Sequence, residues 1–128
     1  SWKYKLNPPK EAAVLLPLCT VDGIASILFT VRSSKLRTHT GEVSFPGGNT
    51  DPEDENPTVT ALRETHEEIL IHPTNVNVLG PFISLPNKSL STKVTAVIGD
   101  LGIISPSLLK FNTDEVESIF TVPIDQLL

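Results

Sequence analysis

Three glutamates near the middle of the chain have the spacing to bind a divalent cation. Residues 58–71 show helical periodicity, and at about 100° per residue Glu64, Glu67 and Glu68 project within an arc of about 100°. The apolar side chains on the opposite side, which are expected to pack on a sheet, are Val59, Leu62 and Ile69. One side of the helix would then belong to the core, and the other would present three carboxylates.

The charges on this helix are unfavourable unless something offsets them. Glu64 and Glu68 are like charges four residues apart, and Glu67 and Glu68 lie where the helix dipole favours cations. A solvated acidic face is one interpretation. The other is a bound divalent cation, because Mg²⁺ prefers oxygen ligands and often bridges carboxylates to substrate phosphates. The spacing alone leaves both interpretations open.

Arg63 lies next to Glu64 and four residues before Glu67. It could form a plain surface ion pair, which is worth under about 1 kcal/mol. If a metal is bound, its role would instead be to hold a carboxylate in the orientation that a ligand needs. We favour this second role.

A cationic segment precedes the helix. Arg32, Lys35 and Arg37 place three cations within six residues, and no Asp or Glu occurs between Ile24 and Thr40. A solvated basic loop is the ordinary interpretation of such a segment. Beside a metal–carboxylate helix, the same cations would position phosphate groups.

Strands and one strongly patterned helix are expected to position these residues. The expected strands are residues 12–20, 24–32, 42–45, 76–85, 92–100 and 115–122, the first two joined by a hairpin turn. The helix should begin with Asn56 as its N-cap and Pro57 at its first position, and end near Ile71, before Pro73. A short helix is expected at residues 124–128. This order of elements predicts an α/β sandwich.

Length and charge narrow the class of protein. The 128 residues suit one domain, residues 1–128, and the net charge of −5 disfavours a nucleic-acid partner. No apolar run approaches the roughly 20 residues that span a bilayer, so no membrane partner is expected. The sequence contains no Met, so we expect it to be trimmed at one or both ends. Cys19 is expected to be a buried, inert thiol.

Together with a glycine pair, the helix matches a known motif. The spacing Gly48-x5-Asp54-x8-Arg63-Glu64-x2-Glu67-Glu68 resembles the Nudix box, a loop–helix–loop motif whose glutamates bind Mg²⁺ or Mn²⁺. There are three departures. Eight residues rather than seven precede the arginine, Thr65 stands where an aliphatic residue is usual, and Leu70 stands where glycine is usual. None of them removes a candidate ligand.

The resemblance implies a fold and a set of site residues. The fold is an α/β/α sandwich with a mixed β-sheet and a loop–helix–loop catalytic motif, and the activity is metal-dependent hydrolysis of a diphosphate bond. The implied metal ligands are Glu64 and Glu68, then Glu67, with the backbone carbonyl of Gly47. The general base would be Glu67 or Glu115, although Glu115 could equally be an exposed residue at a strand edge.

The preceding segment resembles one branch of the family. Leu28-Phe29-Thr30-Val31-Arg32-Ser33-x3-Arg37-x3-Gly41-x3-Phe45-Pro46-Gly47-Gly48 is similar to the signature of coenzyme A diphosphatases, with Phe29 in place of the usual leucine. The same branch commonly carries the extra residue inside the box. The resemblance extends over residues 12–128 and implies an enzyme of this branch.

The substrate implied is coenzyme A, an acyl-coenzyme A or oxidised coenzyme A, cleaved to 3′,5′-ADP and 4′-phosphopantetheine or its acyl form. Arg32, Lys35 and Arg37 would bind its phosphates, and contact of Arg32 or Arg37 with the 3′-phosphate is a hypothesis. One alternative is a Nudix hydrolase of ADP-ribose or NADH. Another is a non-catalytic nucleotide-binding module, against which the intact glutamates argue.

The resemblance also bears on location and assembly. An intracellular location is expected: the peroxisome if the source is eukaryotic, with mitochondrion or cytoplasm as the other options. A homodimer is compatible with the resemblance.

Overall fold

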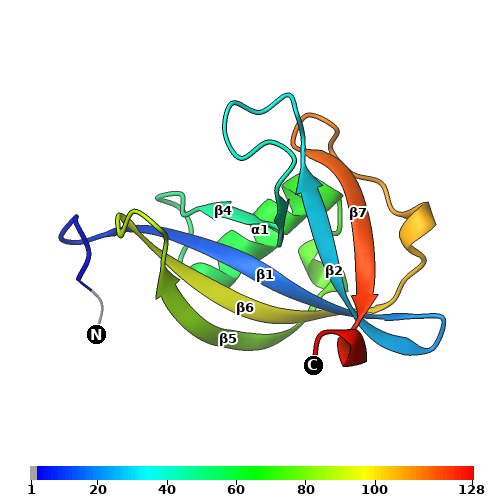
Figure 1. The fold of residues 1–128 in the computed structure, drawn as a ribbon. Helices are drawn as coiled ribbons and strands as arrows, with labels where there is room; N and C mark the ends of the chain where they lie inside the picture. The colour runs from blue at the N-terminus through cyan, green and yellow to red at the C-terminus, as the bar shows by residue number, and fades with distance from the viewer. Residues whose placement is uncertain (1–2) are drawn as a thin grey trace.

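The computed structural model describes residues 3–128 and shows a seven-stranded mixed sheet with one α-helix against one face (Figure 1). The elements are β1 Lys10–Val21, β2 Ile24–Arg32, β3 Val43–Ser44, β4 Gly47–Asn49, α1 Pro57–Ile69, η1 Pro73–Asn75, β5 Asn77–Pro86, β6 Thr92–Ile103, η2 Pro106–Leu108, β7 Val116–Pro123 and η3 Ile124–Gln126. The expected mixed sheet and loop–helix–loop motif are confirmed. The expected C-terminal helix is the single 3₁₀ turn η3. None of the helices formed by residues 3–128 has both the length and the apolar character needed to cross a bilayer.

The central strand β1 has three partners, and this arrangement creates the site. Its residues 18–21 pair antiparallel with β2 across a two-residue turn, in which Asp22 and Gly23 both have positive φ. Its residues 12–14 pair instead with β4, and its other edge pairs in parallel with β6. β2 and β4 therefore pair with different stretches of β1. β4, which contains the glycine pair, occupies the stretch of β1 that β2 leaves unpaired.

Helix α1 begins as its sequence predicts. The side chain of Asn56 accepts a hydrogen bond from the Val59 amide at 3.0 Å, and Pro57 occupies the first turn. The core beneath the helix contains Ala61, packed with buried residues of β1 and β6 and with Val76, which directly precedes β5.

The face that α1 buries differs from the expected one. The buried helix residues are Thr60, Ala61, Thr65, Glu68 and Ile69. The expectation that Val59 packs on the sheet is wrong, because it is 39% exposed. The helix is rotated so that its small residues Ala61 and Thr65 meet the sheet, and this rotation brings Glu68 into the interior.

Phe29, the departure from the branch signature, belongs to a row of three aromatic rings. Its ring stacks on Phe45 with centroids 5.0 Å apart and on Phe120 with centroids 5.3 Å apart. Phe29 and Phe120 are direct cross-strand partners in β2 and β7. Such pairs add about 0.5–1.5 kcal/mol beyond their buried area. Phe29 thus links Phe45, which lies between β3 and β4, to Phe120 of β7.

Leu70 ends the helix at Ile69, two residues before the expected end. It adopts the left-handed conformation (φ 58°, ψ 26°) and its amide donates to the His66 carbonyl at 3.1 Å. Because a Cβ is unfavourable in this region and the side chain is 52% exposed, we expect Leu70→Gly to raise the free energy of unfolding by about 0.5–1 kcal/mol. Urea denaturation measures this change. Leu70→Ala keeps the Cβ and should bring no gain.

Candidate active site

A cleft of about 280 Å³ lies between α1, β4, the loop after β2 and the start of β7. It is lined by Arg32, Leu36, Gly47, Gly48, Asn49, Asp51, Glu64, Glu68 and Glu115. The structure thus brings together five of the residues expected to form a site, from segments up to 83 positions apart in sequence, Arg32 and Glu115 being the most distant. Four carboxylates, those of Asp51, Glu64, Glu68 and Glu115, and the guanidinium group of Arg32 share this small volume.

Glu68 is the most perturbed carboxylate of the cleft. Its side chain is buried, 8% of the residue being exposed, and it accepts a hydrogen bond from the Gly47 amide at 3.1 Å. Burial raises the pKa of Glu68 to about 8, with further increases from Glu64 and Glu115, while Gly47 and Arg32 oppose the rise. This carboxylate has little to offset its charge other than a bound cation.

Glu64 approaches the backbone of β4 closely. A Cβ added at Gly48 would lie 2.6 Å from the Glu64 Cδ and 2.7–2.8 Å from both carboxylate oxygens. Burial and the neighbouring Glu67 raise the pKa of Glu64, and Arg63 opposes the rise. Glycine at position 48 is therefore what allows this carboxylate to reach the cleft.

This contact makes Gly48→Ala a specific test of the position of Glu64. The added methyl meets only the end of a flexible side chain, so we expect the fold to survive and Glu64 to move. The catalytic rate constant should fall by roughly 10²-fold, since an ångström of displacement has effects of that size. Steady-state kinetics and thermal melting measure the two properties.

Gly47→Ala provides the contrast, because a Cβ there would lie 2.6 Å from Val14 Cγ1 and 2.7 Å from Val14 Cα. This variant should lose stability as well as activity. Equal losses of melting temperature in the two alanine variants would contradict the assignment of Gly48.

Arg63 connects the carboxylate helix to the loop before it. Its Nε and Nη2 donate to the two oxygens of Asp54 at 3.2 and 2.9 Å, and its Nη2 also donates to the Asn49 carbonyl at 3.1 Å. Its Nη1 donates to Glu64 at 3.0 Å and to Glu67 at 3.2 Å. The guanidinium group thereby holds the carboxylates of Glu64 and Glu67 in place.

Asp54 is the partner whose importance the sequence analysis missed. Its side chain is 4% exposed and also accepts from the Thr60 hydroxyl at 2.9 Å. Arg63 lowers the pKa of Asp54 to about 2. Asp54 is part of the sequence motif, but no role was predicted for it. The pattern that could have predicted the ion pair is a carboxylate in the loop, nine residues before an arginine in the helix.

Some expected site residues lie outside the cleft. Glu67 is 49% exposed at its side chain and bonds to Arg63 instead. Lys35 pairs with Asp114 at 3.4 Å on the surface, and Arg37 is exposed in the loop after β2. Each of these three residues is adjacent in sequence to a residue that lines the cleft, but none of them lines it.

Arg32 presents an unpaired donor beside the carboxylates. Its Nη2 donates to the Thr38 carbonyl at 3.5 Å. Within residues 3–128, its Nε is the buried side-chain nitrogen or oxygen that lacks a hydrogen-bond partner. Leaving a buried donor unpaired costs about 1–3 kcal/mol, and an anionic oxygen would satisfy it.

Comparison with known proteins identifies the family. The NUDIX domain model matches residues 9–128. The chain belongs to the Nudix family. Nudix hydrolase 3 of Caenorhabditis elegans is 45% identical over 119 residues, which cover 91% of this chain and 48% of the relative. The human mitochondrial coenzyme A diphosphatase NUDT8 is 41% identical, covering 94% of this chain and 51% of the relative.

Other relatives are bacterial. An uncharacterized Nudix hydrolase, NudL of Photorhabdus laumondii, is 42% identical, covering 99% of this chain and 70% of the relative. The chain spans about half the length of the first two curated relatives.

A solved structure of a C. elegans Ap4A hydrolase binary complex superposes with a TM-score of 0.71 at 20% identity, covering 92% of this chain and 82% of that one. This likeness shows the Nudix fold.

Nudix hydrolases generally use a divalent metal, and the residues present fit one. Among residues 3–128, no group of three or more His, Cys, Asp or Glu side chains forms a ready-made cage. Mg²⁺ usually takes one or two carboxylates and completes its shell with water and substrate phosphates. Glu68, which is buried, and Glu64, which is partly buried, both have raised pKa values and match this smaller set.

The raised pKa of Glu68 predicts how the stability of the metal-free Nudix domain depends on pH. The folded state binds the proton more tightly than the unfolded state, whose glutamate pKa is near 4.5. Stability should therefore fall as pH rises from about 5 to 8, by up to about 1.4 kcal/mol per pH unit. Urea denaturation in EDTA measures the slope. Glu68→Gln should flatten it, and an unchanged slope in that variant would contradict the prediction.

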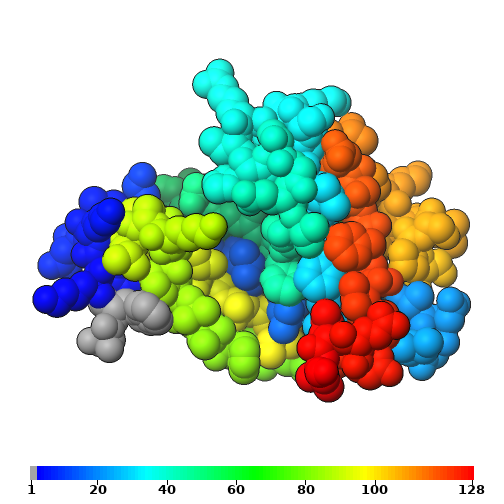
Figure 2. Space-filling model, in the orientation of Figure 1, coloured from blue at the N-terminus to red at the C-terminus, as the bar shows by residue number. Residues whose placement is uncertain are grey.

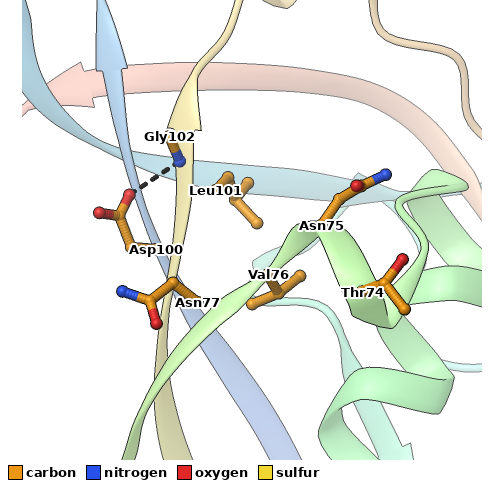
Figure 3. Close-up of a pocket in the computed structure, with 7 residues that line it drawn as sticks. All are labelled: Thr74, Asn75, Val76, Asn77, Asp100, Leu101 and Gly102. Atoms are coloured by element: carbon orange, nitrogen blue, oxygen red, sulfur yellow. Dashed lines mark hydrogen bonds between the residues drawn. The ribbon is translucent and has the colours of Figure 1, made fainter.

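A separate hollow of about 410 Å³ lies where β5 begins and β6 ends (Figure 3). It is lined by Thr74, Asn75, Val76, Asn77, Asp100, Leu101 and Gly102. The carboxylate of Asp100 accepts the Gly102 amide at 2.8 Å. None of the residues expected from the sequence to do chemistry lines this hollow, so the carboxylate cleft is the candidate active site of the Nudix domain.

Proposed function

We propose that this Nudix domain hydrolyses the diphosphate bond of coenzyme A or its derivatives, including acyl and oxidised forms. The observation that carries this proposal is the convergence of Glu64, Glu68, Glu115 and Arg32 on one cleft. The choice of coenzyme A is supported by relatives at about 40% identity that are named coenzyme A diphosphatases. The products would be 3′,5′-ADP and 4′-phosphopantetheine or its acyl form.

Glu64 and Glu68 would hold Mg²⁺ or Mn²⁺. In an extended strand the N–H and C=O of one residue leave toward the same edge. The Gly47 amide donates to Glu68, so the Gly47 carbonyl lies on the same side and suits the expected third ligand. The bound metal would neutralise charge on the diphosphate and acidify a water molecule. Glu67, the remaining expected ligand, is held by Arg63 outside the cleft.

Hydrolysis adds water to one phosphorus atom and breaks the P–O bond of the anhydride. A carboxylate must accept the proton that the water loses. Of the two expected bases, Glu115 lines the cleft and Glu67 does not, so Glu115 is our choice. The guanidinium group of Arg32, which lines the cleft, would bind a phosphate oxygen, because a guanidinium matches phosphate geometry.

The loop after β2 would select the substrate. Lys35 and Arg37 are exposed there. Lys35 pairs with Asp114 at 3.4 Å, so Arg37 is our first choice to meet the 3′-phosphate. Arg37→Ala should lower the preference for coenzyme A over dephospho-coenzyme A. An unchanged preference would remove Arg37 from the phosphate site.

Product analysis on a substrate panel tests the function. Coenzyme A, ADP-ribose and NADH would be incubated with the protein and either Mg²⁺ or Mn²⁺, and products separated by chromatography. Release of 3′,5′-ADP from coenzyme A at the highest kcat/KM supports the proposal. Faster cleavage of ADP-ribose or NADH would replace the substrate. Binding of coenzyme A without cleavage would favour the non-catalytic module.

The subcellular location of the protein and its oligomeric state are predictions. Relatives are named mitochondrial and peroxisomal, and others are bacterial. A peroxisomal, mitochondrial or cytoplasmic location is tested by imaging the full-length protein in its source cell. A homodimer is tested by sedimentation of the purified domain.

A further inference from the structure

A second hollow, of about 480 Å³, opens directly from the catalytic cleft. It shares with the cleft Arg32, Gly47, Gly48, Asn49 and Glu68. Figure 2 shows a depression between the loop after β2, in cyan, and the segment joining β5 to β6, in yellow-green, with parts of β1 visible in blue at its floor. A substrate held at the carboxylates could extend into this depression without a barrier.

The floor of the hollow is aliphatic and belongs to the sheet face opposite α1. Ala13 and Leu15 of β1 are buried on the helix side, so the alternating residues Ala12 and Val14 face the other way. Both line the hollow, together with Val94 of β6, which is the parallel partner of Ala12.

The aliphatic surface continues onto β5 beyond the hollow. Leu85 pairs with Val94, and Ile83 pairs with Ala96. Residues paired across strands share a face, so Leu85 and Ile83 extend the floor toward the sheet edge. They are 45% and 44% exposed. The acyl strip, defined as Ala12, Val14, Val94, Ile83 and Leu85, crosses three strands and so about 10 Å of sheet.

Charge divides the surroundings of the cleft into two sides. The cationic loop with Arg32, Lys35 and Arg37 lies on the side of β2, where His39 and Glu42 also line the hollow, whereas the five side chains of the acyl strip are all aliphatic. A coenzyme A thioester has a related division, because the phosphorylated adenosine lies on one side of the diphosphate and the pantetheine arm, with the acyl chain at its far end, lies on the other. With the diphosphate at Glu64 and Glu68, the pantetheine arm would cross the hollow over Ala12 and Val14, and the acyl chain would reach the outer end of the strip on β5.

We propose that the acyl strip binds the acyl chain of fatty acyl thioesters of coenzyme A, with Leu85 and Ile83 as residues that determine specificity. This inference rests on the proposed function. The occupant is assigned from the continuity of the strip with the catalytic cleft and from its aliphatic composition. Partial burial on an open strip should raise kcat/KM by about twofold per added methylene, less than the effect of complete burial.

The test compares free, acetyl-, butanoyl- and octanoyl-coenzyme A as substrates of the wild type, Leu85→Asn and Leu85→Ala. The wild type should prefer the octanoyl ester, which has six more methylenes, to the acetyl ester by roughly 60-fold, mainly through KM. Leu85→Asn should remove most of this dependence on chain length and leave free coenzyme A within about twofold of wild type. Leu85→Ala should have a smaller effect of the same kind.

The matched control is Leu108→Asn, the same substitution at an exposed residue in η2 that does not line the hollow. It should leave the chain-length dependence intact. Circular dichroism melting verifies that the asparagine variants are folded. A wild type without chain-length dependence, or a Leu85→Asn variant that loses free coenzyme A and octanoyl-coenzyme A equally, overturns the proposal.

If the proposed function is wrong, the same kinetic measurements give a different result. In that case the wild type hydrolyses neither free nor acylated coenzyme A. Calorimetric binding then decides the role of the strip: tighter binding of octanoyl-coenzyme A than of free coenzyme A, lost in Leu85→Asn, supports it. Equal binding of the two ligands by the wild type overturns it.

Discussion

Glu68→Gln is expected to lower kcat by about 10³-fold, with a folded protein and a smaller change in KM. The substitution keeps the size of the side chain and replaces a carboxylate oxygen with an amide, which is a poor ligand for Mg²⁺. The buried Glu68 lies between the Gly47 amide and the other carboxylates of the cleft. Steady-state kinetics with saturating Mn²⁺ or Mg²⁺ measures the loss.

Glu67→Gln is the control for this experiment, since Glu67 is the adjacent residue of the same helix. Its side chain is 49% exposed and bonds to Arg63 outside the cleft. We expect a loss of activity at least tenfold smaller than that of Glu68→Gln. The opposite order would make Glu67 the principal ligand and would require α1 to turn when substrate binds. Binding of Mn²⁺ measured by electron paramagnetic resonance should follow the same order.

Much of the local structure could be predicted because it depends on near neighbours in sequence. The Asn56 cap, Pro57, the turn at Asp22 and Gly23 and the long strands have local signals, and the ends of these elements lie within three residues of expectation. β4 has no such signal. It contains three residues, two of them glycines, and becomes a strand only because β1 offers an edge after β2 departs. The parallel pairing of β1 with β6 is similarly non-local.

The site could be predicted by residue type more than by environment. A helical wheel gives the angles between side chains, but not the rotation at which the helix docks. Ala61 and Thr65 allow α1 to approach the sheet, so Glu68 is buried while Val59 is exposed. The contact of Gly48 with Glu64 and the pairing of Arg63 with Asp54 also depend on this docking. The wheel therefore identified the carboxylates without showing which of them carries the perturbed pKa.

The connection from Asp54 through Arg63 to Glu64 predicts a coupled loss of stability and activity. Asp54→Asn removes the charge from a side chain that is 4% exposed and leaves Arg63 without its bidentate partner. Breaking a buried pair on one side costs about 3–5 kcal/mol, and the retained amide should limit the loss to about 2–3 kcal/mol. Because Arg63 also holds Glu64 at 3.0 Å, kcat should fall by about 10- to 100-fold. Urea denaturation and kinetics at saturating substrate measure the two effects.

Acid titration separates this ion pair from a general loss of packing. The pKa of Asp54 is lowered to about 2, so its contribution is present above the unfolded pKa near 4 and is lost as pH falls toward 2. The stability difference between wild type and Asp54→Asn should therefore shrink over that range. Asp114→Asn is the matched control, since Asp114 forms an exposed pair with Lys35 at 3.4 Å and should change stability by less than about 0.5 kcal/mol. A difference for Asp54→Asn that persists unchanged down to pH 2 would show that packing, and not the charge held by Arg63, fixes the loop against the carboxylate helix.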